Sequence, residues 1–173
     1  MSNYKSYLKN ITTFVFDYDG VLTNGIVTLN EHGEPFRTAN VKDGYALQLA
    51  VKNGYHVAVI SGGRSETIVK RMIALGVDQV FVGVESKIEV FHEYLEAIGE
   101  TPDKVLYMGD DIPDLKCLRE SGLSACPADA AGEIKAVVDY ISPVKGGEGC
   151  VRDVIEQVLK ISGKWMSDGA FTW

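Results

Sequence analysis

Four short apolar segments of the sequence are each followed by polar residues that could take part in chemistry. By itself each residue has an ordinary explanation, because aspartate favours turns, serine caps helices and lysine is usually solvated. Their order along the chain is what indicates a site. The segments with the residues that follow them are Ile11–Phe16 with Asp17 and Asp19, His56–Ile60 with Ser61, Gln79–Val82 with Lys87, and Lys104–Met108 with Asp110, Asp111 and Asp114.

The types of these residues suit transfer of a phosphoryl group. The carboxylate of Asp17 can attack phosphorus and form an aspartyl-phosphate. Asp19 lies two residues further along an extended segment, hence on the same side, where it can serve as general acid and base. Carboxylates from Asp17 and Asp110 suit a hard cation such as Mg²⁺. Ser61 and Lys87 would supply a donor and a positive charge to the non-bridging oxygens.

Other interpretations of the acidic loop, Asp17-Tyr18-Asp19-Gly20, fit the sequence less well. An EF-hand needs its glycine at the sixth position after a helix, whereas Gly20 is fourth and follows a predicted strand. The sequence contains no Gly-x-Ser-x-Gly, His-Glu-x-x-His or Walker lysine motif. Its three histidines are dispersed, which favours surface or structural roles over metal ligation.

The elements that must position these residues alternate along the chain. Two further strands are predicted at Leu123–Cys126 and Asp139–Ile141. Near-continuous apolar strands indicate a sheet covered on both faces, and alternation with helices predicts a doubly wound, Rossmann-like parallel α/β sheet. In that architecture ligands bind beyond the carboxyl ends of the strands. The predicted helices are Asp43–Lys52, Ser65–Leu75 with Ser65 as its cap, Ser86–Ile98, Ile112–Ser121, Asp129–Val138 and Gly149–Ile161.

One segment departs from the alternation. Residues 26–40 (IVTLNEHGEPFRTAN) alternate apolar and polar side chains around a Glu-His-Gly-Glu turn, which predicts a β-hairpin. It follows the acidic loop directly and would project over the strand ends. An isolated hairpin is only marginally stable, so we expect this one to pack on something, another subunit included.

Composition restricts the class of protein. A chain of 173 residues without repeats or a Pro/Ser-rich linker is expected to form one domain, 1–173. A formal net charge of -7 argues against nucleic acid or an anionic membrane as the main partner. No apolar run approaches membrane-spanning length, and three cysteines without framework spacing indicate reduced thiols. We therefore expect a soluble, cytoplasmic protein.

The strand-end motifs resemble those of the haloacid dehalogenase-like phosphatases, over most of the chain. The matching residues are Asp17-Tyr18-Asp19-Gly20-Val21, Ser61 after Val57-Ala58-Val59-Ile60, Lys87, and Gly109-Asp110-Asp111 with Asp114. The resemblance implies Asp17 as nucleophile and Asp19 as general acid and base. It also implies Mg²⁺ held by Asp17, the backbone carbonyl of Asp19 and Asp110. Asp111 and Asp114 would support the site, with Asp114 positioning Lys87 or a metal-bound water.

The spacing of the motifs leaves no room for a cap domain. The chain is therefore similar to the capless branch that contains 3-deoxy-D-manno-octulosonate 8-phosphate (KDO 8-phosphate) phosphatase. That likeness implies hydrolysis of a sugar acid phosphate, KDO 8-phosphate, to KDO and phosphate in lipopolysaccharide sugar biosynthesis. It also implies a homotetramer in which the hairpin (about 26–40) and the C-terminal tail (about 163–173) help close a neighbour's site.

Substrate selection is implied by a smaller set of residues. Arg64 and Arg71, seven residues apart on one helix face, are candidates to bind the substrate carboxylate. Relatives that act on KDO 8-phosphate usually carry arginine directly after the Thr/Ser-Gly pair, whereas here Gly63 intervenes. Relatives that act on nine-carbon 9-phosphates tend to carry glutamate there, which favours the eight-carbon substrate. The other family residues matched at the sugar site are Asn40, Lys42, Asp43, Gly44 and Gly62.

Several alternatives remain open from sequence. A phosphatase of nine-carbon keto-acid 9-phosphates (KDN or sialic acid type) uses the same chemistry. A phospho-acceptor domain would lack Asp19, and a non-catalytic regulatory domain would not need complete motifs. A capless phosphatase of macromolecules is a further possibility. The tail Lys164–Trp173 would be disordered by default, whereas its two tryptophans favour docking on another subunit.

Overall fold

A parallel sheet forms the centre of the computed structural model, which describes residues 4–77 and 79–172. Within these residues six strands lie in the order β5-β4-β1-β6-β7-β8, and every neighbouring pair is parallel. The predicted Rossmann-like sheet is therefore confirmed. The strands are β1 Thr13–Phe16, β4 His56–Ile60, β5 Gln79–Phe81, β6 Val105–Met108, β7 Leu123–Cys126 and β8 Tyr140–Ile141.

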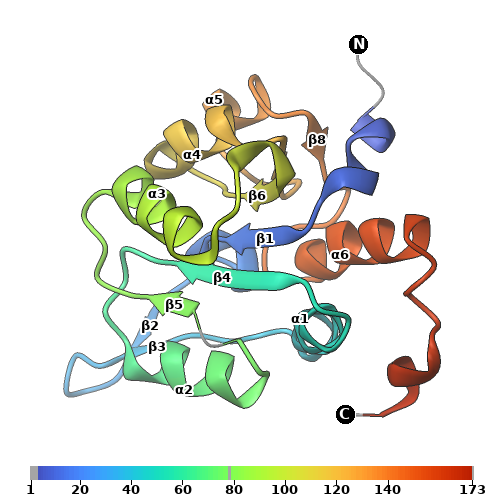
Figure 1. Cartoon of the computed structure of the whole chain (residues 1–173). Coiled ribbons are helices and arrows are strands. Elements are labelled where there is room, and N and C mark those ends of the chain that lie inside the picture. The colour runs from blue at the N-terminus through green and yellow to red at the C-terminus, as the bar shows by residue number, and fades with distance from the viewer. Residues whose placement is uncertain (1–3, 78, 173) are drawn as a thin grey trace.

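Helices cover both faces of the sheet. Figure 1 shows α1, α2 and α6 on one side and α3, α4 and α5 on the other, as right-handed crossovers require when the chain reverses direction across a sheet. This arrangement confirms the doubly wound fold. The helices are α1 Val41–Lys52, α2 Glu66–Ala74, α3 Lys87–Ile98, α4 Leu115–Glu120, α5 Gly132–Lys135 and α6 Cys150–Ile161.

The strands alternate their side chains between two apolar cores. Phe14 and Phe16 of β1 pack with α1, α2 and α6, whereas Val15 packs with α3, α4 and α5. All three side chains are fully buried. Burial on both faces explains why these strands are apolar at successive positions instead of alternating with polar residues.

Two predicted helices differ from the observed ones. Residues 112–121 form a 3-10 turn, Ile112–Asp114, before α4 begins, and Pro113 in that turn lacks an N–H for a regular helical ladder. The predicted helix 129–138 shortens to α5, because the Asp129 carboxylate accepts a hydrogen bond from Gly146 N instead of a helical N–H. Ser65 precedes α2 without a side-chain cap, so its predicted capping bond is wrong.

A short antiparallel hairpin lies within the predicted 26–40 segment. Its strands are β2 Thr28–Leu29 and β3 Pro35–Phe36. The side chain of Asn30 closes the turn, because its Oδ1 accepts hydrogen bonds from the N–H groups of His32 and Glu34. With only two residues in each strand, the hairpin depends on contacts elsewhere for its position.

The C-terminal tail packs against its own chain. Tyr45 of α1 donates a hydrogen bond to the carbonyl of Ala170, and Trp165 contacts the Tyr45 ring edge-on. The guanidinium of Arg152 lies 5.0 Å from the centre of the Trp165 ring. This packing contradicts the default of a disordered tail; Trp173 lies outside the described residues. None of the described helices is long and apolar enough to span a membrane.

The burial of Phe91 in the core beneath α3 predicts a large loss of stability when its ring is removed. Phe91 is fully buried and meets the Tyr107 ring edge-on at 5.8 Å. We expect Phe91→Ala to lower the free energy of unfolding by about 3–5 kcal/mol, because the lost ring leaves a cavity. Urea denaturation followed by circular dichroism measures this. Phe171→Ala is the matched control, since Phe171 is 70% exposed. Equal losses of unfolding free energy in the two variants would contradict the placement of Phe91 in the buried core.

Candidate active site

The acidic motifs meet where the order of the strands reverses. β1 pairs with β4 on one side and with β6 on the other, so Asp17 and Asp110 follow neighbouring strands at the switch point. Ligands bind at this place in doubly wound sheets. A cavity of about 440 Å³ opens there; its lining comprises Asp17, Asp19, Gly25, Ser61, Gly62, Gly63, Val84, Glu85, Lys87, Asp110, Asp111, Pro113 and Asp114.

Lys87 joins two of the carboxylates at the bottom of this cavity. Its Nζ lies 2.8 Å from Asp17 Oδ1 and 2.8 Å from Asp114 Oδ1. Asp114 also accepts a hydrogen bond of 2.7 Å from the hydroxyl of Tyr107, and Asp17 Oδ1 accepts one of 2.7 Å from Tyr18 N. Asp17, Lys87 and Asp114 are all buried. The lysine at the start of α3 therefore fixes the orientation of the predicted nucleophile.

The carboxylates outnumber the cations in this buried cluster. Desolvation and the neighbouring Asp114 raise the pKa of Asp17 above its ordinary value, although Lys87 opposes this. Desolvation and Asp114 also raise the pKa of Asp110. Burial alone would disfavour the ammonium, but Asp114 and Asp17 raise the pKa of Lys87. The site is therefore short of positive charge.

That shortage fits a divalent cation. Oxygen atoms of Asp17, Asp110 and Asp114 lie within 4.8 Å of one another. Lys87 and Tyr107 both bind Oδ1 of Asp114, while its Oδ2 is buried without a hydrogen-bond partner among the described residues. All three carboxylates are therefore suited to face the ion, and Asp17 and Asp110, with the Asp19 carbonyl, are its predicted ligands. A bound Mg²⁺ would supply the positive charge that the protein side chains lack.

Glycines allow the acidic loops to approach one another. Gly20 has a φ of +87°, and a Cβ there would lie 2.0 Å from Asp110 Oδ2. Gly146 packs on the same loop from the other side, because a Cβ there would lie 1.9 Å from the Gly20 carbonyl oxygen. Side chains at either position would displace the acidic loop.

The remaining predicted chemical residues line the same cavity. Ser61 is buried, and its Oγ accepts a hydrogen bond of 3.1 Å from Gly63 N, which leaves its proton available to a ligand. Asp19 is less buried than Asp17, and its carboxylate accepts two hydrogen bonds from Arg37 of the hairpin. Asp111 is exposed at the rim and caps the turn through Ile112 N.

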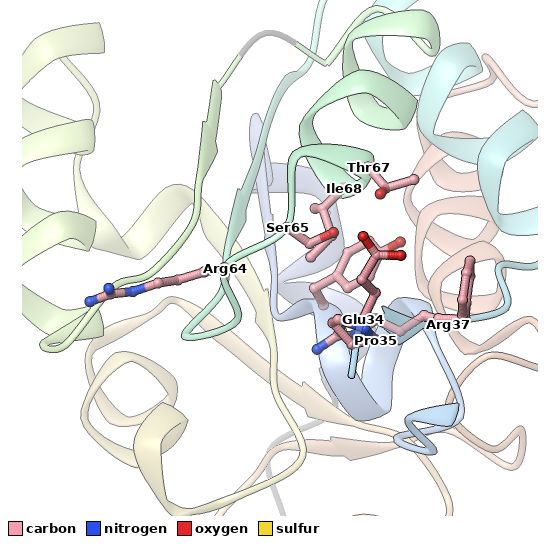
Figure 2. Close-up of a pocket in the computed structure, with 9 residues that line it drawn as sticks. Glu34, Pro35, Arg37, Arg64, Ser65, Thr67 and Ile68 are labelled. Atoms are coloured by element: carbon pink, nitrogen blue, oxygen red, sulfur yellow. The ribbon is translucent and has the colours of Figure 1, made fainter. Parts of the chain in front are cut away.

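A second cavity of about 350 Å³ lies between the hairpin and the start of α2 (Figure 2). Arg37 connects it with the first cavity, since it lines the second and holds Asp19 in the first. The residues that line it are Tyr18, Glu34, Pro35, Phe36, Arg37, Arg64, Ser65, Thr67 and Ile68. Hydroxyls, a carboxyl group and the Arg37 side chain in one recess suit a polar ligand with several oxygen atoms.

Comparison with known proteins identifies the family. No family model matches the chain. The 3-deoxy-D-manno-octulosonate 8-phosphate phosphatase KdsC of Escherichia coli (strain K12) is 33% identical over 156 residues, covering 90% of this chain and 83% of that protein. The chain belongs to the KDO 8-phosphate phosphatase family. The resemblance seen in the sequence motifs is thereby confirmed.

Solved structures of KDO 8-phosphate phosphatases agree with this assignment. The enzyme from Yersinia pestis has a TM-score of 0.93 at 30% identity, covering 96% of this chain and 90% of that one. The enzyme from Moraxella catarrhalis, solved with a magnesium ion, a phosphate ion and a KDO molecule, has a TM-score of 0.89 at 32% identity and covers 92% of each chain. The fold around the candidate site is therefore that of the family.

The predicted substrate arginines lie apart from the main cavity. Figure 2 shows the Arg64 guanidinium extending away from Ser65 and Thr67, and its side chain runs along Gly83. Arg71 packs over Gly44 between α2 and α1, and it is among the described lining residues of neither cavity. Carboxylate binding by these two arginines stays a prediction.

The other predicted sugar contacts divide between the cavity and the start of α1. Gly62 lines the cavity. Asn40 caps α1 through Lys42 N, and its Nδ2 donates a hydrogen bond of 3.2 Å to the Gly147 carbonyl. Lys42 is exposed, and Gly44 is buried beneath Arg71. In this structure Asn40 therefore acts on the acidic loop through the Gly146-Gly147 turn.

Asp43, predicted as a sugar contact, instead caps another helix. It is 1% exposed, and its Oδ1 accepts a hydrogen bond of 2.7 Å from Arg152 N in the first turn of α6. Its Oδ2 is buried without a partner among the described residues. Desolvation raises the pKa of Asp43 to about 6, although the α6 N–H groups oppose the shift. A buried helix cap does not reach the cavity.

Two residues of the site were missed from sequence. Tyr107 looked like one more apolar residue of a strand, and its hydroxyl gives no separate signal. Arg37 did give a signal, because it is the one lysine or arginine in residues 26–40, directly after the acidic loop. A single cation in a segment expected to cover five aspartates is a candidate partner for one of them.

The burial of Asp43 predicts a pH effect on stability. The pKa of Asp43 in the folded protein, about 6, lies above its ordinary value of 3.8. The protonated carboxyl therefore contributes its full stabilisation of the fold below pH 4, and this stabilisation is lost as the pH rises through 6. The loss amounts to roughly 3 kcal/mol. Between pH 4 and 7, Asp43→Asn should therefore gain about that much stability relative to the natural chain, measured by urea unfolding.

A second variant separates the charge from the cap. Asp43→Ala removes the acceptor as well, so it should be less stable than Asp43→Asn by about 1 kcal/mol at every pH. A stability difference between Asp43→Asn and the natural chain that stays constant from pH 4 to 7 would contradict this account.

Proposed function

We propose that this chain is a magnesium-dependent phosphomonoesterase that hydrolyses KDO 8-phosphate to KDO and phosphate, a step of KDO biosynthesis. The observation that carries the proposal is the buried Asp17–Lys87–Asp114 network, which aims one carboxylate into a cavity shared with Asp19, Ser61 and Asp110. Membership of the family and the KDO complex of the Moraxella relative support the substrate.

The first half of the proposed reaction transfers the phosphoryl group to Asp17. Oδ1 of Asp17 is held by Lys87 and Tyr18 N, which leaves Oδ2 to attack phosphorus. An O–P bond forms there while the bond from phosphorus to the sugar oxygen breaks. Asp19 donates a proton to that leaving oxygen, and Lys87 and Ser61 bind the non-bridging oxygens.

The second half releases phosphate. Asp19, now deprotonated, takes a proton from water, whose oxygen attacks phosphorus and breaks the bond to Asp17. The carboxylate of Asp17 and the protonated Asp19 are regenerated. Asp17, Asp110 and the Asp19 carbonyl would hold Mg²⁺, which would lower the repulsion between the Asp17 carboxylate and the phosphate.

The second cavity is the place proposed for the sugar acid. It adjoins the phosphate site through Arg37 and offers the hydroxyls of Ser65 and Thr67. Arg64 and Arg71 remain the proposed partners of the substrate carboxylate, and Asn40, Lys42, Asp43 and Gly44 are proposed to act by placing α1 beside the site.

A phosphate-release assay tests the function. With Mg²⁺ we expect kcat/KM for KDO 8-phosphate to exceed that for a nine-carbon keto-acid 9-phosphate by at least about 10-fold, since the family binds the eight-carbon acid. Asp17→Asn, an isosteric change, should lower kcat by at least about 1,000-fold. Chelation of Mg²⁺ should abolish turnover reversibly. A preference for the nine-carbon substrate would overturn the substrate, and full activity of Asp17→Asn would overturn the mechanism.

We further propose that the chain acts as one domain, 1–173, in a cytoplasmic homotetramer in which a neighbouring subunit completes each site. The free, buried cysteines Cys117, Cys126 and Cys150 support a reducing compartment. Support for the tetramer comes from the hairpin, where Ile26, Val27, Leu29 and Phe36 are 42% to 65% exposed. Exposed apolar side chains gathered on one element indicate a protein interface.

The tetramer is tested by light scattering after size exclusion. We expect a mass of four times 18.9 kDa for the natural chain. Val27→Glu should dissociate it, because the charge would be buried in the interface. Val137→Glu is the matched control, since Val137, two residues after the end of α5, is 40% exposed against 42% for Val27. A monomeric natural chain, or dissociation by both variants alike, would contradict the proposed interface.

A further inference from the structure

The hairpin makes one strong polar contact with the catalytic loop. Arg37 Nε lies 2.6 Å from Asp19 Oδ1, and Arg37 Nη2 lies 3.0 Å from Asp19 Oδ2. The guanidinium thus binds both carboxylate oxygens side by side, which fixes the plane of the carboxylate as well as its distance. The side chain of Arg37 is 13% exposed, so water competes little for this contact.

The pairing is exclusive on both sides among the described residues. Both hydrogen bonds to the Asp19 carboxylate come from Arg37, and Asp19 is the one acidic partner of that arginine. The third nitrogen, Nη1, is buried and has no acceptor in the described part of the chain. Among the described residues, no other side chain hydrogen-bonds the Asp19 carboxylate and so fixes its orientation in this structure.

The main chain after β4 closes the pair from the other side. A Cβ at Gly63 would lie 3.2 Å from Asp19 Oδ2, 3.3 Å from Ser61 Oγ and 3.4 Å from Arg37 Nη2. Gly63 thus leaves the space in which the guanidinium and the carboxylate meet, beside Ser61. The pair is enclosed by the hairpin, the acidic loop and the β4–α2 loop.

From this geometry we propose that Arg37 is a positioning residue for Asp19. The hairpin delivers the guanidinium, the guanidinium holds the carboxylate at the angle at which a proton can pass to and from the reacting oxygen, and Gly63 provides the room. The proposal rests on the function proposed above, in which Asp19 is the acid and base. Misplacement of a catalytic group by about 1 Å costs up to roughly 100-fold in rate.

A double-mutant cycle tests this role. Kinetic constants for phosphate release from KDO 8-phosphate are measured for Arg37→Ala, Asp19→Asn and the double variant. We expect Arg37→Ala alone to lower kcat by about 10- to 100-fold with KM changed less than about threefold. In the Asp19→Asn background the same change should lower kcat by less than about twofold, because the group that Arg37 positions is already absent.

Two further variants serve as controls. Arg37→Lys keeps the charge with one point of contact and should recover part of the lost kcat. Arg119→Ala removes an exposed arginine on α4, far from the machinery described, and should keep full activity. Circular dichroism and thermal unfolding establish that each variant is folded.

The outcomes separate this inference from the function it rests on. No phosphate release by the natural chain would overturn the function. With an active natural chain, unchanged kcat in Arg37→Ala, or an equal loss of kcat in the Asp19→Asn background, would overturn the positioning role. A rise in KM with kcat unchanged would do so too, because Arg37 would then bind the substrate directly, through the unpaired Nη1.

Discussion

The buried ammonium of Lys87 between Asp17 and Asp114 is the interaction on which the rest of the site depends. Three charged groups with almost no access to water are tolerated only when each has a partner, since one unpaired buried charge costs several kcal/mol. The partners come from the residue after β1, from the start of α3 and from the turn after β6. The order of the strands in the sheet is thus a requirement of the chemistry, because it places these three segments together.

The loops around this buried cluster must also approach one another closely, and glycines make this possible. Gly20 lets Asp110 lie against the acidic loop, and Gly146 lets the segment before α6 pack on that loop from behind. Asp43 holds α6 at its first turn. Residues far apart in sequence therefore pack on the turn Tyr18–Leu22, and the hairpin covers its open side. A capless site is defined here by contacts with glycines and a short ribbon instead of by a second domain.

Much of this was predictable from sequence, for a local reason. Strands covered on both faces must be apolar at successive positions, so Phe14, Val15 and Phe16 reveal β1 without any knowledge of their partners. Parallel topology then brings every strand end to one edge, which is why Asp17, Asp19, Ser61, Lys87 and Asp110 could be assigned to one site in advance. The predicted fold and family were correct because these signals are periodic and repeated.

What the sequence determined by itself is the set of chemical groups and the edge of the sheet at which they meet. Only the tertiary structure decided which group each one touches. Arg37 reaches Asp19 across 18 residues and Asp43 reaches Arg152 across 109, and neither distance follows from a local pattern. The contact of Arg64 with Gly83 and the packing of the C-terminal tail on α1 likewise do not follow from a local pattern. A long side chain has several partners within its reach, and the packing of distant segments selects among them.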